Sequence, residues 1–175
     1  MNLVYVNPPH PATLSEEALL KHCEISFGRA AGPGGQHRSK VETAVSLLHK
    51  PTQIRAHATE RRRQYENRRM AIRRLRLKLA TQVRTCVPPN SYQPSALWRQ
   101  RRQGKHIPIN PRHADYPALL ADALDLVVAR KFDVAGAAGI LGVTMSQLAK
   151  LLRHEKHAFA LVNEGRAKRR LPPLK

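Results

Sequence analysis

The residues best suited to chemistry lie in one glycine-rich stretch, Gly28 to Lys40, in which four glycines fall within eight residues. Glycine adopts backbone angles closed to other residues and lets another backbone approach closely, so such a stretch is typical of a loop that meets a ligand. It matches neither common phosphate-binding pattern, because no Gly-Lys-Ser/Thr opens a helix and no third glycine stands at a helix start. Paired carboxylates, a Ser-His-Asp order and a His-rich metal spacing are also missing nearby. What remains is a loop that ends in Gly34-Gly35-Gln36, with cationic residues around it.

The stretch from about Glu24 to Leu79 resembles the peptidyl-tRNA hydrolase domain of class I peptide chain release factors, a family whose signature is Gly-Gly-Gln. Three residues recur easily by chance, so the resemblance depends equally on the surrounding matches. These are Arg29-Ala30 before the tripeptide, and Lys40, Ala44-Val45, His49, Pro51-Thr52, Gln64 and Asn67 after it. Together they make the resemblance specific over about a third of the chain.

The sequence departs from the family pattern at three positions around the loop. Ser39 stands where the family usually has Asn, Gln53 where it usually has Gly, and Arg63 where it usually has Ser. These changes bear on the stability of the base of the loop rather than on its chemistry.

The resemblance implies hydrolysis of the ester that joins a peptide to the 3′ end of tRNA, with Gly34, Gly35 and Gln36 as the catalytic residues. Gln36 would place the attacking water, and its backbone N–H would stabilise charge that develops in the transition state. The two glycines would let the backbone bend so that this N–H faces the reaction. Because ribosomal RNA of the peptidyl transferase centre builds the site, the protein need not supply a strong base, and we expect no metal and no cofactor. Arg29, Arg38 and Lys40 would grip RNA phosphates, and Gln36 is a candidate for methylation.

The elements that must position this loop form an α+β unit. After extended, Pro-rich residues 1–12, a first helix begins near Leu14, with Thr13 and Ser15 as rival caps. We expect strands at 24–29, 43–49 and 53–58, the last two joined by a turn at 50–52. A long helix then runs from Glu60 to about Val83, capped by Thr59.

This long helix carries the densest positive charge, because residues 60–84 hold ten lysines and arginines against two acids. A run of like charge is often a solvated face or a disordered tail. Here an apolar stripe recurs at helical spacing, which a tail would not keep: Tyr65, Ile72, Leu75, Leu79 and Val83. Guanidinium groups bind phosphates in a bidentate fork, so we predict RNA contacts on the opposite face by Arg61, Arg62, Arg68, Arg69 and Arg73.

Residues 86–113 read as a basic, Pro-rich linker between a domain at 1–85 and a second domain at 114–175. Trp98 stands among basic residues without an acid, a composition suited to base stacking and to RNA contacts by Arg101 and Arg102. The alternative, in which Trp98 plugs into a domain surface, is equally open.

The second domain is predicted to be small and all-helical, with a short basic C-terminus. Asp115 starts one helix, Asp133 caps a short helix that ends at Gly142, and Thr144 caps a third. The turn from Ala137 to Thr144 resembles a helix-turn-helix. That geometry serves nucleic-acid contact or plain packing, and the sequence leaves both open.

The composition of the whole chain fits a protein that acts on RNA. The 175 residues carry a formal net charge of +19 and a pI near 11.2, which favours a polyanionic partner. No apolar run approaches the roughly 20 residues of a membrane span. The N-terminus is neither a secretory signal nor a transit peptide. Two cysteines fit a reducing cytosol better than a disulfide framework. Nothing demands oligomerisation, so we expect a cytoplasmic monomer.

The short length before the first strand points to a particular kind of release factor. Full release factors have a separate domain that reads stop codons, and a long coiled coil, whereas about 23 residues precede the strand here. The chain thus resembles short, codon-independent ribosome-rescue hydrolases. Two alternatives remain: a non-catalytic ribosome- or RNA-binding protein that keeps the fold as a docking scaffold, and a DNA-binding regulator that uses residues 133–154.

Overall fold

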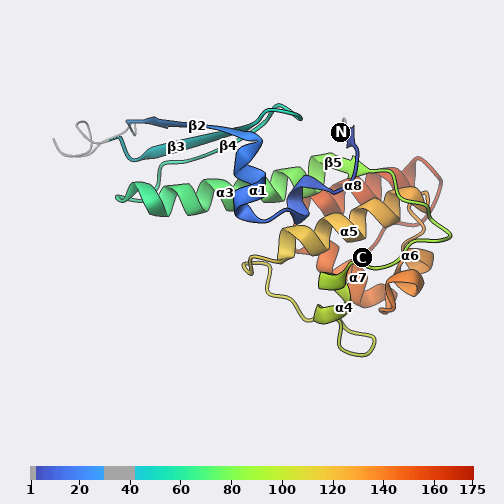
Figure 1. Cartoon of the computed structure of the whole chain (residues 1–175). Helices are drawn as coiled ribbons and strands as arrows, with labels where there is room; N and C mark the ends of the chain where they lie inside the picture. Colours follow the sequence, from blue (N-terminus) through green and yellow to red (C-terminus); the bar gives the residue numbers. More distant parts are fainter. Residues whose placement is uncertain (1–2, 30–41) are drawn as a thin grey trace. The chain divides into compact units, whose positions relative to one another are not determined.

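The computed structural model describes residues 3–29 and 42–175 (Figure 1). The chain mixes helices and strands, as predicted. It divides into two compact units. The sheet unit comprises residues 14–79, and the helical unit combines the residues up to 13 with residues 80–175. Each unit has a buried apolar core of its own.

The sheet unit is built on three antiparallel strands in the order β2-β3-β4. β2 spans Cys23–Gly28, β3 spans Ala44–His49 and β4 spans Ile54–Ala58, each within one residue of its predicted bounds. The turn between β3 and β4 ends at Gln53, which has a positive φ of 58°. Glycine usually occupies such a position because it lacks a Cβ, so the departure from the family pattern falls on a strained residue.

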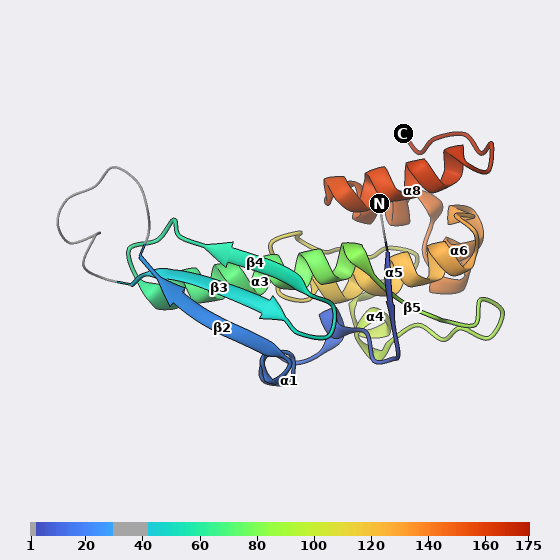
Figure 2. The same ribbon diagram turned by 90° about the horizontal axis from the view of Figure 1, so that it is seen from above.

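One face of this sheet is apolar and covered by α3 (Gln64–Gln82), which runs beneath the strands in Figures 1 and 2. Alternate residues of β3 and β4, among them Val45, Leu47 and Ala56, are buried on this face. The helix is also tied to β4 by polar contacts, since the Lys78 ammonium donates to the Arg55 carbonyl at 2.7 Å. The sheet thus has one covered face and one polar face.

The first helix, α1 (Glu16–Lys21), is capped by Ser15, whose hydroxyl accepts from the Ala18 N–H at 3.2 Å. The rival cap Thr13 instead ends a short 3₁₀ turn, η1 (Pro11–Thr13), and donates its hydroxyl to the His10 carbonyl. The choice between the two capping residues was open in the sequence, and the preceding turn decides it.

The start of α3 differs from the prediction by four residues, because the helix begins at Gln64 rather than Glu60. The N–H and the carbonyl of Arg61 both bond to the Asn67 side chain, which holds the residues before the helix in a turn. Thr59 is therefore no N-cap, and its N–H donates to the Glu60 carboxylate. The predicted role of Tyr65 is also wrong, since its side chain is 54% exposed, while the rest of the apolar stripe is buried.

The helical unit contains a pair of short strands that no sequence pattern predicts. β1 (Val4–Val6) pairs in parallel with β5 (Val83–Thr85), with Val4 opposite Val83. Residues 1–12 were predicted to be extended and were grouped with the glycine-rich segment in one domain at 1–85. In the structure this pairing makes them part of the helical unit. Three-residue strands carry too little alternation to be recognised from sequence.

Five helices make up the rest of the helical unit (Figure 1). They are α4 (Ala96–Arg101), α5 (Tyr116–Ala129), α6 (Val134–Leu141), α7 (Met145–Arg153) and α8 (Lys156–Ala167). α5 is the central helix, buried over most of its length. Two predicted caps are confirmed, because Asp133 accepts from the Gly136 N–H and Thr144 from the Gln147 N–H. Gly142 ends α6 in the left-handed conformation, with φ at 69°.

The last residues of the chain fold back on the helical unit. Leu174 is buried, and its N–H donates to the Asn163 side chain at 2.8 Å. Arg166 donates to the carbonyls of Pro172 and Phe132. In the part of the chain that the structure describes, no single helix is both long and apolar enough to cross a membrane.

Candidate functional site

The predicted catalytic residues Gly34, Gly35 and Gln36 lie outside the described residues, together with Arg38 and Lys40. The structure does describe the chain on either side of them. The segment that holds these residues connects β2 to β3, and Gly28 lies opposite Ala44 in the register of the two strands. The chain therefore leaves and rejoins the sheet at one end.

Two amide side chains hold the backbone where the chain rejoins the sheet. Asn67 is fully buried, and its Nδ2 donates to the Thr43 carbonyl at 2.7 Å. Gln64 donates from Nε2 to the Glu42 carbonyl at 2.9 Å. The same Asn67 amide bonds both polar groups of the Arg61 backbone, each at 2.9 Å. In sequence, Gln64 and Asn67 were only family matches; the contacts show that they form an amide clamp on residues 42–43.

The predicted RNA-binding arginines of the sheet unit are exposed to solvent. Arg29 lies just after β2, and the others lie on the turn before α3 and on its outer face: Arg61, Arg62, Arg68, Arg69 and Arg73. Among the residues described, Arg62, Arg68 and Arg69 form no ion pair. Their guanidinium groups are therefore available to a polyanion.

Other arginines of α3 serve the fold instead. Arg74 donates to the His57 carbonyl at 2.7 Å and pairs with Glu60. The hydrogen bond from the Arg74 guanidinium to the Glu60 carboxylate lowers the pKa of that carboxyl to about 2. Arg76 donates to the Leu14 carbonyl. The sequence shows an almost continuous run of arginines, and the structure divides it into a structural set and an exposed set.

The basic stretch around Trp98 is built into the helical unit. The Trp98 side chain is fully buried and donates from Nε1 to the Leu141 carbonyl at 2.9 Å. The structure therefore favours the alternative in which Trp98 packs inside the domain, because a fully buried indole ring cannot stack on a base. Arg101 pairs with Asp115 through two of its nitrogens, and Arg102 donates to the Gly142 carbonyl. Both predicted RNA contacts thus lie in residues that also hold the fold together.

Asp115 was expected to cap α5 and does not, because no backbone N–H of the helix donates to its side chain. Its carboxylate is held by Arg101 instead. Its carboxylate thus bonds a full positive charge through two guanidinium nitrogens instead of a backbone N–H.

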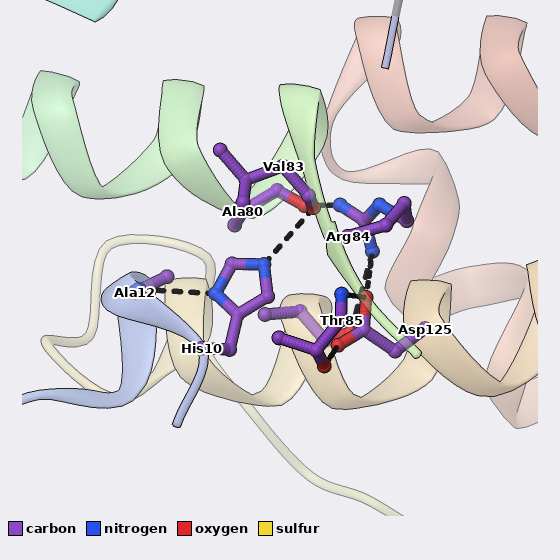
Figure 3. A network of polar contacts seen from close by, with 8 residues as sticks. His10, Ala12, Ala80, Val83, Arg84, Thr85 and Asp125 are labelled. Carbon is purple, nitrogen blue, oxygen red and sulfur yellow. Dashed lines mark hydrogen bonds and ion pairs between the residues drawn. The ribbon is translucent and has the colours of Figure 1, made fainter. Parts of the chain in front are cut away.

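A buried polar network joins β5, α5 and the N-terminal segment (Figure 3). Arg84 and Asp125, which are 1% and 4% exposed, form an ion pair at 2.8 Å. The Thr85 N–H and hydroxyl also donate to Asp125, and Arg84 donates to the Ala80 carbonyl. A lone acid between Leu124 and Leu126 was the sequence signal for this network, since a buried acid needs a partner.

Burial sets the protonation of this network. It lowers the pKa of Arg84 to about 10, against the favourable effect of Asp125, so the guanidinium stays charged at neutral pH. It lowers the pKa of His10 to about 4. The neutral ring suits its place in Figure 3, because Nδ1 accepts from the Ala12 N–H while Nε2 donates to the Val83 carbonyl.

The two helices of the predicted helix-turn-helix are α6 and α7. α6 and α7 meet at an angle of 104° around the turn at Gly142, within the roughly 90–120° typical of the motif. Leu148, Leu151 and Leu152 face the core, while Ser146 and Lys150 are exposed. Among the described residues, no group of three His, Cys, Asp or Glu side chains gathers as metal ligands do.

Comparison with known proteins gives a consistent result. The sequence pattern of the RF-1 domain matches residues 16–105, slightly more than half of the chain. The match covers nearly all of the sheet unit, together with β5 and α4. The helices α5 to α8 lie outside the match.

Similar proteins bear release-factor names. A chloroplastic peptide chain release factor of Arabidopsis thaliana is 50% identical over 56 residues, which are 32% of this chain and 12% of that protein. The mitochondrial peptide chain release factor 1 of Bos taurus is 36% identical over 75 residues, 43% of this chain and 17% of that protein. Peptide chain release factor 1 of Caldicellulosiruptor bescii is 46% identical over 71 residues, 41% of this chain and 20% of that protein. The chain therefore spans a fifth or less of the length of these three relatives.

Proposed function

The chain belongs to the RF-1 domain family of class I release factor-like proteins, and on this basis we propose that it hydrolyses peptidyl-tRNA on the ribosome. The observation that carries the proposal is the place of Gly34-Gly35-Gln36 within the matched residues, between two paired strands. The amide clamp of Gln64 and Asn67 on residues 42–43 adds support, because it fixes one end of the segment that presents the tripeptide.

The proposed reaction is attack of water on the ester carbonyl between the peptide and the 3′ ribose of tRNA. The bond from the carbonyl carbon to the ribose oxygen breaks, and a proton from water passes to that oxygen. Gln36 places the water, and its backbone N–H stabilises the negative charge on the carbonyl oxygen in the transition state. Gly34 and Gly35 let the backbone approach the RNA without a Cβ in the way. Ribosomal RNA completes the site, so the protein supplies position rather than a base.

The exposed cations around this segment would bind RNA phosphates. In the described part of the sheet unit these are Arg29 and the exposed arginines of the α3 region. We propose the same phosphate-binding role for Arg38 and Lys40. The partners are ribosomal RNA of the peptidyl transferase centre and peptidyl-tRNA, the place of action is the cytoplasm, and the protein acts as a monomer.

We further propose that release needs no stop codon, so that the protein rescues stalled ribosomes. In this proposal the stalled state is recognised by residues outside the family match, which in this chain form a short N-terminal strand and the helices α5 to α8. The sheet unit at 14–79 is then the catalytic part, and the helical unit, which includes the predicted connecting stretch 86–113, carries the helix-turn-helix-like pair of α6 and α7.

The catalytic proposal is tested by a matched pair of glycine substitutions. Gly35→Ala is expected to abolish peptide release from ribosomes that carry peptidyl-tRNA, while ribosome binding survives. Gly139→Ala is the control, because a Cβ there meets nothing within 4 Å and its release rate should equal that of the wild type. Release by Gly35→Ala at the wild-type rate would overturn the catalytic role. Absence of release by the wild type, with ribosome binding intact, would favour the alternative in which the fold only docks on the ribosome.

The rescue proposal is tested with three messenger RNAs. One is truncated at the P site, one extends with a sense codon and one extends with a stop codon. We expect release on the truncated message, with no gain from the stop codon. Release that depends on the stop codon would contradict codon independence while leaving the hydrolase proposal intact.

A further inference from the structure

A groove of about 440 Å³ lies along the exposed face of α7, within the helical unit. Such a volume falls in the range of roughly 300–1,000 Å³ typical of small-ligand sites. α7 contributes Gln147 and Lys150, and His154 follows at its C-terminal end. The facing segment contributes Gln103, His106 and the largely buried Ile107. The lining therefore combines amides, imidazoles and one ammonium over an apolar floor.

The wall opposite α7 is held in place by backbone bonds. Gln103 and His106 exchange two N–H to carbonyl bonds of 2.9 Å across a tight turn at Gly104, which has a φ of 57°. The Thr144 N–H donates to the Lys105 carbonyl at 3.1 Å and joins this turn to the start of α7. The groove is therefore preformed, so a ligand does not have to order its walls.

The electrostatics of the groove select an anion. No carboxylate lines it, and Lys150 forms no ion pair within residues 3–29 and 42–175. Most acids of the helical unit are neutralised elsewhere by a basic partner: Asp115 by Arg101, Asp125 by Arg84, Asp133 by Arg130 and Glu164 by Lys168. The Asp122 carboxyl accepts from the Ser95 hydroxyl and does not line the groove, and burial raises its pKa to about 6.

We propose that this groove binds an unpaired nucleotide of RNA. Lys150 contacts the phosphate, the amides of Gln103 and Gln147 bond the polar edge of the base, and the imidazoles of His106 and His154 flank its ring. RNA-binding proteins usually read bases that have been splayed out of a helix, by stacking and by bonds to their edges. The choice of RNA rests on the proposed function of the chain on the ribosome.

The shape of the site separates this proposal from DNA reading by a helix-turn-helix. A recognition helix enters the major groove of DNA as a convex rod. Here the 103–109 segment stands beside α7 and turns the exposed face of that helix into one side of a hollow. A hollow suits a single projecting base better than a duplex.

The test compares three fluorescein-labelled probes on the full chain: an RNA hairpin with an unpaired loop, a blunt RNA duplex and a DNA duplex of the same length. The exposed arginines of the sheet unit bind every probe through phosphates, so the quantity that matters is the ratio of the duplex Kd to the hairpin Kd. We expect the wild type to prefer the hairpin by about tenfold, as the stacking of one base would give.

Two variants isolate the groove. Lys150→Gln removes its ammonium, and Lys131→Gln removes one exposed charge outside its lining. Lys150→Gln should lower the hairpin preference several-fold, and Lys131→Gln should leave it unchanged. Gln147→Ala keeps the charge and should also lower the preference. Trp98 fluorescence during urea unfolding confirms that each variant is folded, since that indole is buried in the same unit.

The outcomes also separate this inference from the proposed function. Equal effects of Lys150→Gln and Lys131→Gln would overturn the groove as a nucleotide site. A wild-type preference for the DNA duplex that Lys150→Gln abolishes would replace RNA by DNA as the ligand. If the wild type released no peptide but kept its preference for the hairpin, the hydrolase proposal would be overturned and the groove would remain a nucleotide site.

Discussion

The two compact units differ in where their acids lie. In the sheet unit, the amides of Gln64 and Asn67 hold the backbone together with Arg74 and Lys78. Within the described residues, Arg62, Arg68 and Arg69 of this unit form no ion pair. In the helical unit, charged groups do the holding, as in the buried pair of Arg84 with Asp125 and the half-buried pair of Arg101 with Asp115.

The difference shows that arginine content alone does not define an RNA-binding surface. Both units are strongly basic, but a guanidinium that is paired within the protein must first lose that partner to bind a phosphate. An amide clamp carries no charge, so it can anchor a loop beside a polyanion without repelling or capturing it. The position of the acids therefore decides which arginines remain available.

The largest expected effect lies in the charged network of the helical unit. Asp125→Ala leaves Arg84 as an unpaired buried charge, which should cost about 3–5 kcal/mol of the free energy of unfolding. Urea unfolding followed by Trp98 fluorescence reports on this unit. The control Asp133→Ala removes an exposed helix cap and should cost about 1 kcal/mol. Similar losses in the two variants would mean that the network contributes no more than a surface cap.

An intermediate effect is expected from the amide clamp. Asn67→Ala removes three part-buried hydrogen bonds, one to the Thr43 carbonyl and two to the Arg61 backbone, and each should contribute about 0.5–1.5 kcal/mol to stability. It should also slow peptide release, because the segment with Gly34-Gly35-Gln36 loses an anchor. Gln64→Ala removes one exposed bond and should affect release less. Unchanged release by a folded Asn67→Ala variant would show that the clamp serves stability alone.

The smallest effect is expected from two double variants that each remove two arginine charges. These variants compare exposed arginines directly with arginines that are bonded within the protein. Arg68→Gln/Arg69→Gln should reduce the slope of log Kd against log salt for ribosomal RNA by about 1 per lost phosphate contact. Arg101→Gln/Arg102→Gln should leave that slope nearly unchanged and lower the stability of the helical unit by up to about 1 kcal/mol. An equal change of slope in both would show that paired arginines bind RNA as well as exposed ones.

Much of the fold could be predicted from local sequence patterns. The strands before and after the glycine-rich segment, the caps at Asp133 and Thr144 and the glycine that ends α6 depend on residues within a few positions of each other. Propensity, capping and alternation are local properties, so one sequence is enough to show them. The start of α3 was misplaced for the opposite reason, since Asn67 acts on Arg61 through a side-chain bond that no local rule anticipates.

The sequence by itself determined the chemistry that this chain can offer: Gly34-Gly35-Gln36, the family pattern around it and the excess of positive charge. Only the tertiary structure decided which groups are free to act. It buried Trp98, paired Arg101 with Asp115, turned Asn67 onto the Thr43 backbone and placed the 103–109 segment along α7. The physical reason is that availability depends on partners distant in sequence, and long-range contacts become visible only when the chain is folded.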